Sequence, residues 1–302
     1  MDISLLSDLQ RSIARHAKPD APVCRVLPNL VLMSASVPTP PIGEITEPVF
    51  ALVAQGTKQV CLGDRIFEYS TGQYLIVSVD LPLEAHVAEA ATERPYLGLG
   101  FALRPEAIAT LLLEAGPMQV GQPNPSGIAV SDLTDDLVEP MVRLLKLVEC
   151  PKDIPILGAA IEREILWRLI NGPQGAMVRQ IGLADSRMAQ IGRTIRWIRN
   201  HYAESFRIED LARIAGMSVT SFHRHFLGVT SLTPIQYQKQ IRLQMARSRL
   251  MSAAEDVAEV AFAVGYDSPS QFSREYRRQF GFSPGEDGRR LRQVNELAGA
   301  SR

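Results

Sequence analysis

The chain has 302 residues, of which 46% are hydrophobic and 22% charged, as in ordinary soluble globular proteins. This length allows two domains, and the net charge of −1 points to no particular partner. No segment approaches the roughly 18 uninterrupted apolar residues of a membrane span, so we expect no membrane partner. Three cysteines without paired spacing and an N-terminus without a secretory signal predict a cytoplasmic protein.

The residue pattern over the first 102 residues predicts one helix followed by a series of strands. Residues 1–18 have the pattern of an amphipathic helix, with Leu5, Leu6, Leu9 and Ile13 on one side. Short apolar or alternating runs then follow one another from about Val23 to Ala102, separated by turn residues such as Gly72. Several strands at this spacing, without a helical pattern between them, predict an antiparallel sandwich or barrel.

Two side chains in this region are candidates for binding a small molecule. Cys61 lies between Val60 and Leu62 in an alternating strand, where its thiol can react with an electrophile such as an aldehyde. The alternative is that Cys61 only fills space, as buried cysteines more often do. His86 is the second candidate, with a hydrogen-bonded wall residue as its alternative.

The sequence predicts neither a metal site nor an enzyme. Residues 1–185 contain only the histidines His16 and His86, which lie far apart, whereas a catalytic metal usually needs three protein ligands. We also find no glycine-rich phosphate loop, no serine elbow and no Cys-x-x-Cys motif. We therefore expect no catalytic residues and no cofactor.

Two helices are predicted after the strands. The first carries an apolar stripe from Leu133 to Val148, and the second begins near Pro155 and ends at Asn171. These helices either pair with their copies in a homodimer or cover the strands of their own chain. Residues 175–186 are expected to form the hinge between two domains.

The most informative feature is a repeat, because residues 208–234 occur again, with substitutions, at 257–284. The shared positions fall at an offset of 49 up to Gly265 and of 50 beyond it. They are Ile208, Leu211, Ala212, Gly216, Ser218, Phe222, Arg224, Phe226 and Pro234 in the first copy, and Val257, Val260, Ala261, Gly265, Ser268, Phe272, Arg274, Tyr276 and Pro284 in the second.

Each copy predicts two helices that meet across a tight turn containing a glycine. Phe222 and Phe226 turn the second helix of the first copy inward, as Phe272 and Tyr276 do in the second copy. The opposite faces carry side chains that can hydrogen-bond base edges in a major groove. These predicted DNA-binding residues are Thr220, His223, Arg224, Ser270, Gln271, Ser273 and Arg274.

A helix that begins at Thr233 and Pro234 and runs to about Met251 is predicted between the copies. Residues 186–302 contain 18 Lys and Arg against 11 Asp and Glu, so they carry +7, which leaves −8 on residues 1–185. Such asymmetry is typical of a nucleic-acid-binding part joined to a different one. Arginines that are candidates for phosphate contacts, with solvated surface charges as the alternative, are Arg193, Arg196, Arg242, Arg247, Arg249, Arg277 and Arg278.

The segments LARIAGMSVTSFHRHF, TPIQYQKQIRLQMARSRL and VAFAVGYDSPSQFSREYRRQFGFSP resemble the paired helix-turn-helix domain of AraC-type transcriptional regulators over residues 187–292. By position, this resemblance places the predicted DNA-binding residues at base-contacting sites of the family. The chain departs from the family pattern after Pro284, because Asp287 and Gly288 replace the usual aromatic residue and arginine. The segment GTKQVCLGDRIFEYSTGQYLIVSVDLP resembles the cupin-like N-terminal domain of one AraC-type subfamily, which is taken to sense a small molecule.

The sequence therefore predicts an α+β protein with two domains. Residues 1–180 are expected to form a cupin-like antiparallel β-barrel with flanking helices, and residues 186–292 an all-α domain with two helix-turn-helix units. The expected function is sequence-specific transcription regulation, with double-stranded DNA, an unknown small-molecule effector, a second copy of the chain and RNA polymerase as partners. The alternatives are a barrel enzyme with an accessory DNA-binding domain and a nonspecific architectural DNA binder.

Overall fold

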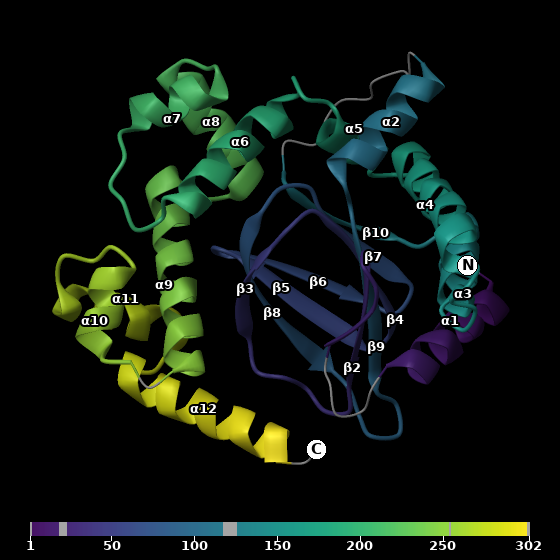
Figure 1. Ribbon diagram of the computed structural model, residues 1–302, viewed down its shortest axis with the longest axis horizontal. Helices are drawn as coiled ribbons and strands as arrows, with labels where there is room; N and C mark the ends of the chain where they lie inside the picture. The colour runs from purple at the N-terminus through teal and green to yellow at the C-terminus, as the bar shows by residue number, and fades with distance from the viewer. Residues whose placement is uncertain (1, 18–22, 117–125, 254, 301–302) are drawn as a thin grey trace. The chain divides into compact units, whose positions relative to one another are not determined.

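The computed structural model describes residues 2–17, 23–116, 126–253 and 255–300 (Figure 1). The chain divides into two compact units, each of which is described by itself. The first comprises Met1–Gly192 with Gly228–Ser231, and the second Arg193–Leu227 with Leu232–Arg302. Within the described ranges, no helix combines the length and apolarity needed to cross a membrane.

The first unit is built on two antiparallel sheets. One has six strands in the order β1-β2-β9-β4-β7-β10, and the other has four in the order β3-β8-β5-β6. The strands are β1 (Val23–Leu27), β2 (Leu30–Ala35), β3 (Ile42–Thr46), β4 (Val49–Gln55), β5 (Thr57–Leu62), β6 (Arg65–Ser70), β7 (Gln73–Val77), β8 (Leu81–Glu89), β9 (Tyr96–Ala102) and β10 (Ile128–Asp132). The predicted antiparallel cupin-like domain is confirmed, although its strands form two separate sheets rather than one closed barrel.

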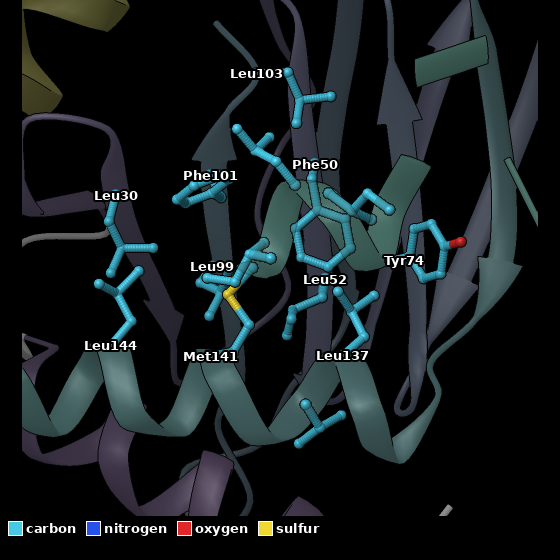
Figure 2. Close-up of a cluster of buried hydrophobic side chains, with 14 of the residues drawn as sticks. Leu30, Phe50, Leu52, Tyr74, Leu99, Phe101, Leu103, Leu137, Met141 and Leu144 are labelled. Atoms are coloured by element: carbon cyan, nitrogen blue, oxygen red, sulfur yellow. The ribbon is translucent and has the colours of Figure 1, made fainter. Parts of the chain in front are cut away.

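The helices of the first unit cover one face of the six-stranded sheet. They are α1 (Ile3–His16), α2 (Pro105–Ala115), α3 (Asp135–Leu147), α4 (Ala159–Asn171), which follows the short π-helical turn Ile154–Gly158, and α5 (Gly175–Gly182). Figure 2 shows Leu137 and Met141 of α3 pointing toward Phe50 and Leu99 of the sheet, and all four side chains are buried. The apolar stripe of α3 therefore covers the strands of its own chain.

The segment expected to be a hinge, residues 175–186, is folded instead. Its first part is helix α5, and Met177 and Val178 are fully buried in the core that α3 and α4 also share. Gly175 begins α5 close to the Ile170 carbonyl, where the ideal position of a Cβ atom is already filled. Gly175 therefore allows close packing rather than flexibility. The prediction of a hinge at residues 175–186 was wrong for this segment.

The described residues of the second unit form helices joined by turns and loops, with no strand among them. These helices are the C-terminal part of α6 (Arg187–Asn200), α7 (Ile208–Ala215), α8 (Val219–Thr230) as far as Leu227, α9 (Pro234–Ser252), α10 (Val257–Ala263), α11 (Pro269–Phe280) and α12 (Pro284–Ala300). Thr233 begins α9 with a capping box, because its hydroxyl accepts from the Gln236 amide while the Gln236 side chain accepts from the Thr233 amide. The repeat and the linking helix predicted from the sequence are therefore confirmed as helix pairs α7–α8 and α10–α11 on either side of α9.

Candidate nucleic-acid interface

Each helix pair turns at a glycine in the left-handed region. Gly216 has φ +67° between α7 and α8, and Gly265 has φ +89° between α10 and α11. A residue with a Cβ atom adopts this backbone only at a cost, which is why both copies have glycine here. The second helix of the second pair then begins at Ser268, whose hydroxyl accepts a hydrogen bond from the Gln271 amide at 3.4 Å.

The two turns are alike in backbone but not in surroundings. A Cβ atom on Gly216 meets no atom within 4 Å, whereas one on Gly265 collides with the carbonyl oxygen of Ala203. We expect Gly216→Ala to lower the free energy of unfolding by about 1 kcal/mol and Gly265→Ala by about 3 kcal/mol, because only the second adds a steric clash to the backbone strain. Equal losses in urea unfolding of the two variants would contradict the close approach of Ala203.

The inward faces of the second helices are packed with aromatic rings. Phe222 and Phe226 of α8 lie 5.4 Å apart between ring centroids, and Phe226 packs edge-on against Tyr237 of α9 at 5.6 Å. In the second copy, Phe272 and Tyr276 of α11 lie 5.5 Å apart, and all these rings are buried. This packing fixes the rotation of each helix and thereby decides which side chains it presents outward.

The opposite faces of α8 and α11 are open to solvent. On α8, Thr220, His223 and Arg224 are exposed. On α11, Ser270, Gln271 and Arg274 are exposed and Ser273 is half-buried. The structure thus brings the predicted DNA-binding residues together in two groups, one on each second helix.

Helix α11 is also fixed to the linking helix through Glu275. This carboxylate accepts from the Lys239 ammonium of α9 at 2.7 Å and from the Tyr266 hydroxyl at 2.9 Å. Burial, followed by the hydrogen bond to Glu275, raises the pKa of Tyr266. The Gln271 side-chain amide donates at 3.4 Å to the same Glu275 oxygen that Lys239 contacts. Glu275 therefore positions α11 and one of its outward side chains.

Arg242, a candidate for phosphate contacts, has an internal position on α9. Its guanidinium donates to the carbonyl oxygens of Tyr202 at 2.6 Å, Gly265 at 2.7 Å, and Ala203 and Glu204 at 3.2 Å each. Burial lowers the pKa of Arg242, and three nearby acidic groups partly offset this effect. One side chain thus ties the segment before α7 to the turn of the second helix pair. These four bonds use four of the five N–H donors of the guanidinium, so little is left for a phosphate contact.

The remaining candidate arginines fall into two groups. Arg247 pairs with Asp287 at 2.8 Å and lies over the Phe280 ring, and Arg249 forms an ion pair with Glu255. The side chains exposed to solvent are those of Arg193, Arg196, Arg277 and Arg278.

Asp287, where the sequence departs from the family pattern, is a fully buried carboxylate. It accepts hydrogen bonds from Arg247 of α9 at 2.8 Å, from the Tyr276 hydroxyl of α11 at 3.0 Å and from Arg290 of α12 at 3.1 Å. Burial, and then the Asp287 charge, raise the pKa of Tyr276. Asp287 therefore joins three helices of the second unit.

The two candidate ligand residues of the first unit lie on the same side of the four-stranded sheet. Cys61 pairs with Glu84, and His86 pairs with Gln59, so all four side chains point to one face. Val60 is buried on the opposite face. Among the described residues, no group of three His, Cys, Asp or Glu side chains lies close enough to hold a metal ion.

Two family models match the chain. The model described as the N-terminus of AraC-type transcriptional regulators matches residues 26–177, about half of the chain. The chain belongs to the AraC-type transcriptional regulators. The model of a helix-turn-helix domain matches residues 211–290, which extend from within α7 through α11 of this AraC-type chain.

Curated relatives and solved structures extend this result. The transcriptional activator RhaS from Escherichia fergusonii is 28% identical over 172 residues, 56% of this chain and 60% of RhaS. RhaS from Klebsiella pneumoniae is 30% identical over 42% of this chain and 45% of that protein. The AraC-type chain thus matches roughly half the length of these relatives.

A crystal structure of ToxT from Vibrio cholerae, with unsaturated fatty acid bound, has a TM-score of 0.54 at 7% identity and covers 86% of this chain and 93% of ToxT. A second ToxT structure, bound to a naphthalenyl butenoic acid, has a TM-score of 0.56 at 12% identity and covers 87% and 98%. At such low identity these structures show that the AraC-type chain shares the two-domain fold.

Proposed function

We propose that this AraC-type regulator is a cytoplasmic transcription factor that binds double-stranded DNA by inserting α8 and α11 into major grooves. The observation that carries the proposal is the exposure of Arg224 on α8 and Arg274 on α11, each opposite a buried aromatic face. An arginine in this position can donate two hydrogen bonds to one guanine, which is the commonest specific contact in a major groove. A similar position in both copies supports recognition of two adjacent DNA segments.

The other DNA-binding residues have supporting roles in this proposal. Thr220, His223, Ser270, Gln271 and Ser273 would contact neighbouring bases. Arg193, Arg196, Arg277 and Arg278 would contact phosphates and provide salt-sensitive affinity without sequence preference. The bonds of Arg242, Arg247 and Arg249 favour a positioning role for these three arginines over a phosphate contact.

For the first unit we propose the sensing of a small-molecule effector, within a division into domains of residues 1–180 and 186–292. ToxT, which shares the fold, binds an unsaturated fatty acid, and RhaS is a transcriptional activator. The effector would change the affinity for DNA through a coupling of about 1–3 kcal/mol. Homodimerisation, supported by the exposed side chains of Ile156, Leu157 and Trp167, and contact with RNA polymerase complete the proposal.

The two alternative functions, a barrel enzyme and a nonspecific architectural DNA binder, require different side chains from those that this proposal requires. A metal-dependent barrel enzyme needs a ligand cluster, which the described residues do not provide. A nonspecific DNA binder needs positive charge but no base-reading side chains, whereas α8 and α11 both expose such side chains. We therefore propose a regulator without catalytic activity.

The test compares Arg224→Ala and Arg274→Ala with the wild-type chain. Each variant should lose about 1–3 kcal/mol in binding to the operator, because a bidentate base contact disappears, with little change on random DNA. The operator is first located by footprinting on upstream genomic fragments, and affinities are then measured at one salt concentration.

Arg207→Ala is the matched control, because Arg207 is an exposed arginine of the same unit that lies before α7. The Arg207→Ala variant should bind the operator almost as tightly as the wild type, because it loses only one surface charge. Equal losses on operator and random DNA for Arg224→Ala or Arg274→Ala would show that these arginines contact only phosphates.

A further inference from the structure

The ammonium group of Lys58 lies between the two sheets of the first unit. In the four-stranded sheet, Lys58 of β5 is paired with Tyr69 on one side and Val87 on the other, and both neighbours are buried. The Lys58 Nζ donates to the sulfur of Met33, in β2 of the six-stranded sheet, at 3.3 Å. The Lys58 side chain therefore crosses the space that separates the inner faces of the two sheets.

This ammonium has only a weak partner. A methionine sulfur is a poor hydrogen-bond acceptor, and a lysine can donate three hydrogen bonds. Throughout the described ranges, no carboxylate lies within ion-pair distance of Lys58. Glu44, on the same face of the sheet, interacts with it only at longer range. Burial lowers the pKa of Lys58, and Glu44 only partly offsets this effect. A cation that the protein partly removes from water in this way is stabilised by any anion that can reach it.

A second unpartnered group points to the same place. The Tyr96 side chain is 1% exposed, and its hydroxyl has no hydrogen-bond partner among the described residues. This hydroxyl lies directly over Gly98, because a Cβ atom on Gly98 would collide with it. Gly98 is the cross-strand partner of Met33. The Tyr96 hydroxyl and the Lys58 ammonium, which come from opposite sheets, therefore both lie at the cross-strand pair of Met33 and Gly98.

The inner-face side chains around these groups are apolar and buried in the middle of the sheets and exposed on one edge strand. Val53, beside Gly98, and Leu83, beside Glu44, are buried on the two inner faces. On the edge strand β3, by contrast, the inner-face residues Ile42 and Glu44 are exposed. Lys58 itself, in an inner strand, is also partly exposed. The inner faces thus offer apolar side chains and two hydrogen-bond donors, and their exposed edge lies at β3.

We propose that the space between the sheets binds an effector with a carboxylate group and an apolar tail, and that Lys58 and Tyr96 bind the carboxylate. This inference rests on the proposed sensing role of the first unit. The ammonium provides the countercharge and the phenol a second donor, while the tail lies against the apolar walls. The carboxylate would satisfy both groups that the protein leaves without a strong partner.

The test is calorimetric titration of the full-length protein, without DNA, with octanoate, phenylacetate and the uncharged 1-octanol. The wild-type protein should bind at least one of the two carboxylates, and bind it about tenfold or more tightly than 1-octanol. Lys58→Met, which keeps the apolar stem, should remove this preference. Tyr96→Phe, which removes only the unpartnered hydroxyl, should weaken carboxylate binding about tenfold.

Lys152→Met is the matched control, because it removes an exposed lysine of the same unit, and it should bind as the wild type does. Circular dichroism checks that each variant is folded. If Lys58→Met does not fold, the Tyr96→Phe result alone decides. Failure of the wild type to bind either carboxylate at millimolar concentration, or unchanged binding by Tyr96→Phe, overturns the inference. Because DNA is absent, this result is independent of whether the second unit recognises an operator.

Discussion

Arg242→Met should lower the free energy of unfolding of the second unit by about 4 kcal/mol, because several charge-assisted hydrogen bonds to carbonyl groups disappear at once. Methionine keeps the apolar stem, so the loss reports on the guanidinium contacts. The same variant should bind the operator more weakly than Arg224→Ala does, because Arg242 ties the segment before α7 to Gly265 in the second turn. Without this tie the two helix pairs are no longer held in one arrangement.

The measurement is urea unfolding followed by tryptophan fluorescence. The chain has two tryptophans, Trp167 in the first unit and Trp197 in the second, so a Trp167→Phe background makes the signal specific for the second unit. Arg249→Met is the control on the same helix, and it should cost less than about 1 kcal/mol because its ion pair with Glu255 is partly solvated. Similar losses for the two variants would refute the tie between the helix pairs.

The helical unit was predictable because its signals are local. Phe222 and Phe226, four residues apart, give the inward face of α8, and Gly216 and Gly265 mark the two turns. Each signal depends on a few neighbouring residues and was present twice in the sequence. The strand runs were predictable for the same reason. Their division into sheets of six and four was not, since strand pairing joins residues far apart in the chain.

The roles of the arginines could not be read from residue type. An arginine on a helix between two repeated units has neighbours on several sides, so it is as well placed to bind carbonyl groups as to bind phosphates. Arg242 binds the Gly265 carbonyl, 23 residues away, and Arg247 binds the Asp287 carboxylate, 40 residues away, so both make internal contacts. The useful signal was the position of α9 between the copies, which made internal contacts the default for part of its surface.

In the first unit, the alternation of apolar residues along β5 shows which face each side chain occupies, and residue type alone does not. Val60 and Leu62 are apolar on either side of Cys61, so the cysteine points away from the face that they bury. The same rule places Lys58 on the buried face, two residues before Val60. Lysine is mostly found exposed, and no neighbouring residue in the sequence indicates that the Lys58 side chain extends to the other sheet. Contact with Met33 depends on the packing of one sheet against the other.

Asp287→Ala should lower the free energy of unfolding of the second unit by about 4 kcal/mol, because it leaves the largely buried Arg247 without its countercharge. The Tyr276 hydroxyl also loses its acceptor. Urea unfolding in the Trp167→Phe background again gives the value. Tyr276→Phe removes one bond to the same carboxylate and should cost only about 1 kcal/mol.

A double variant separates the loss of charge balance from the loss of packing at this position. Arg247→Met combined with Asp287→Leu removes both buried charges and fills the space with apolar side chains. It should recover most of the stability lost in Asp287→Ala, since replacing a whole buried ion pair with apolar groups is often neutral. Arg290 is affected less, because its side chain is 44% exposed and water can solvate it. If the double variant is as unstable as Asp287→Ala, the geometry of the three hydrogen bonds, and not the balance of charge, is what Asp287 contributes to the junction of α9, α11 and α12.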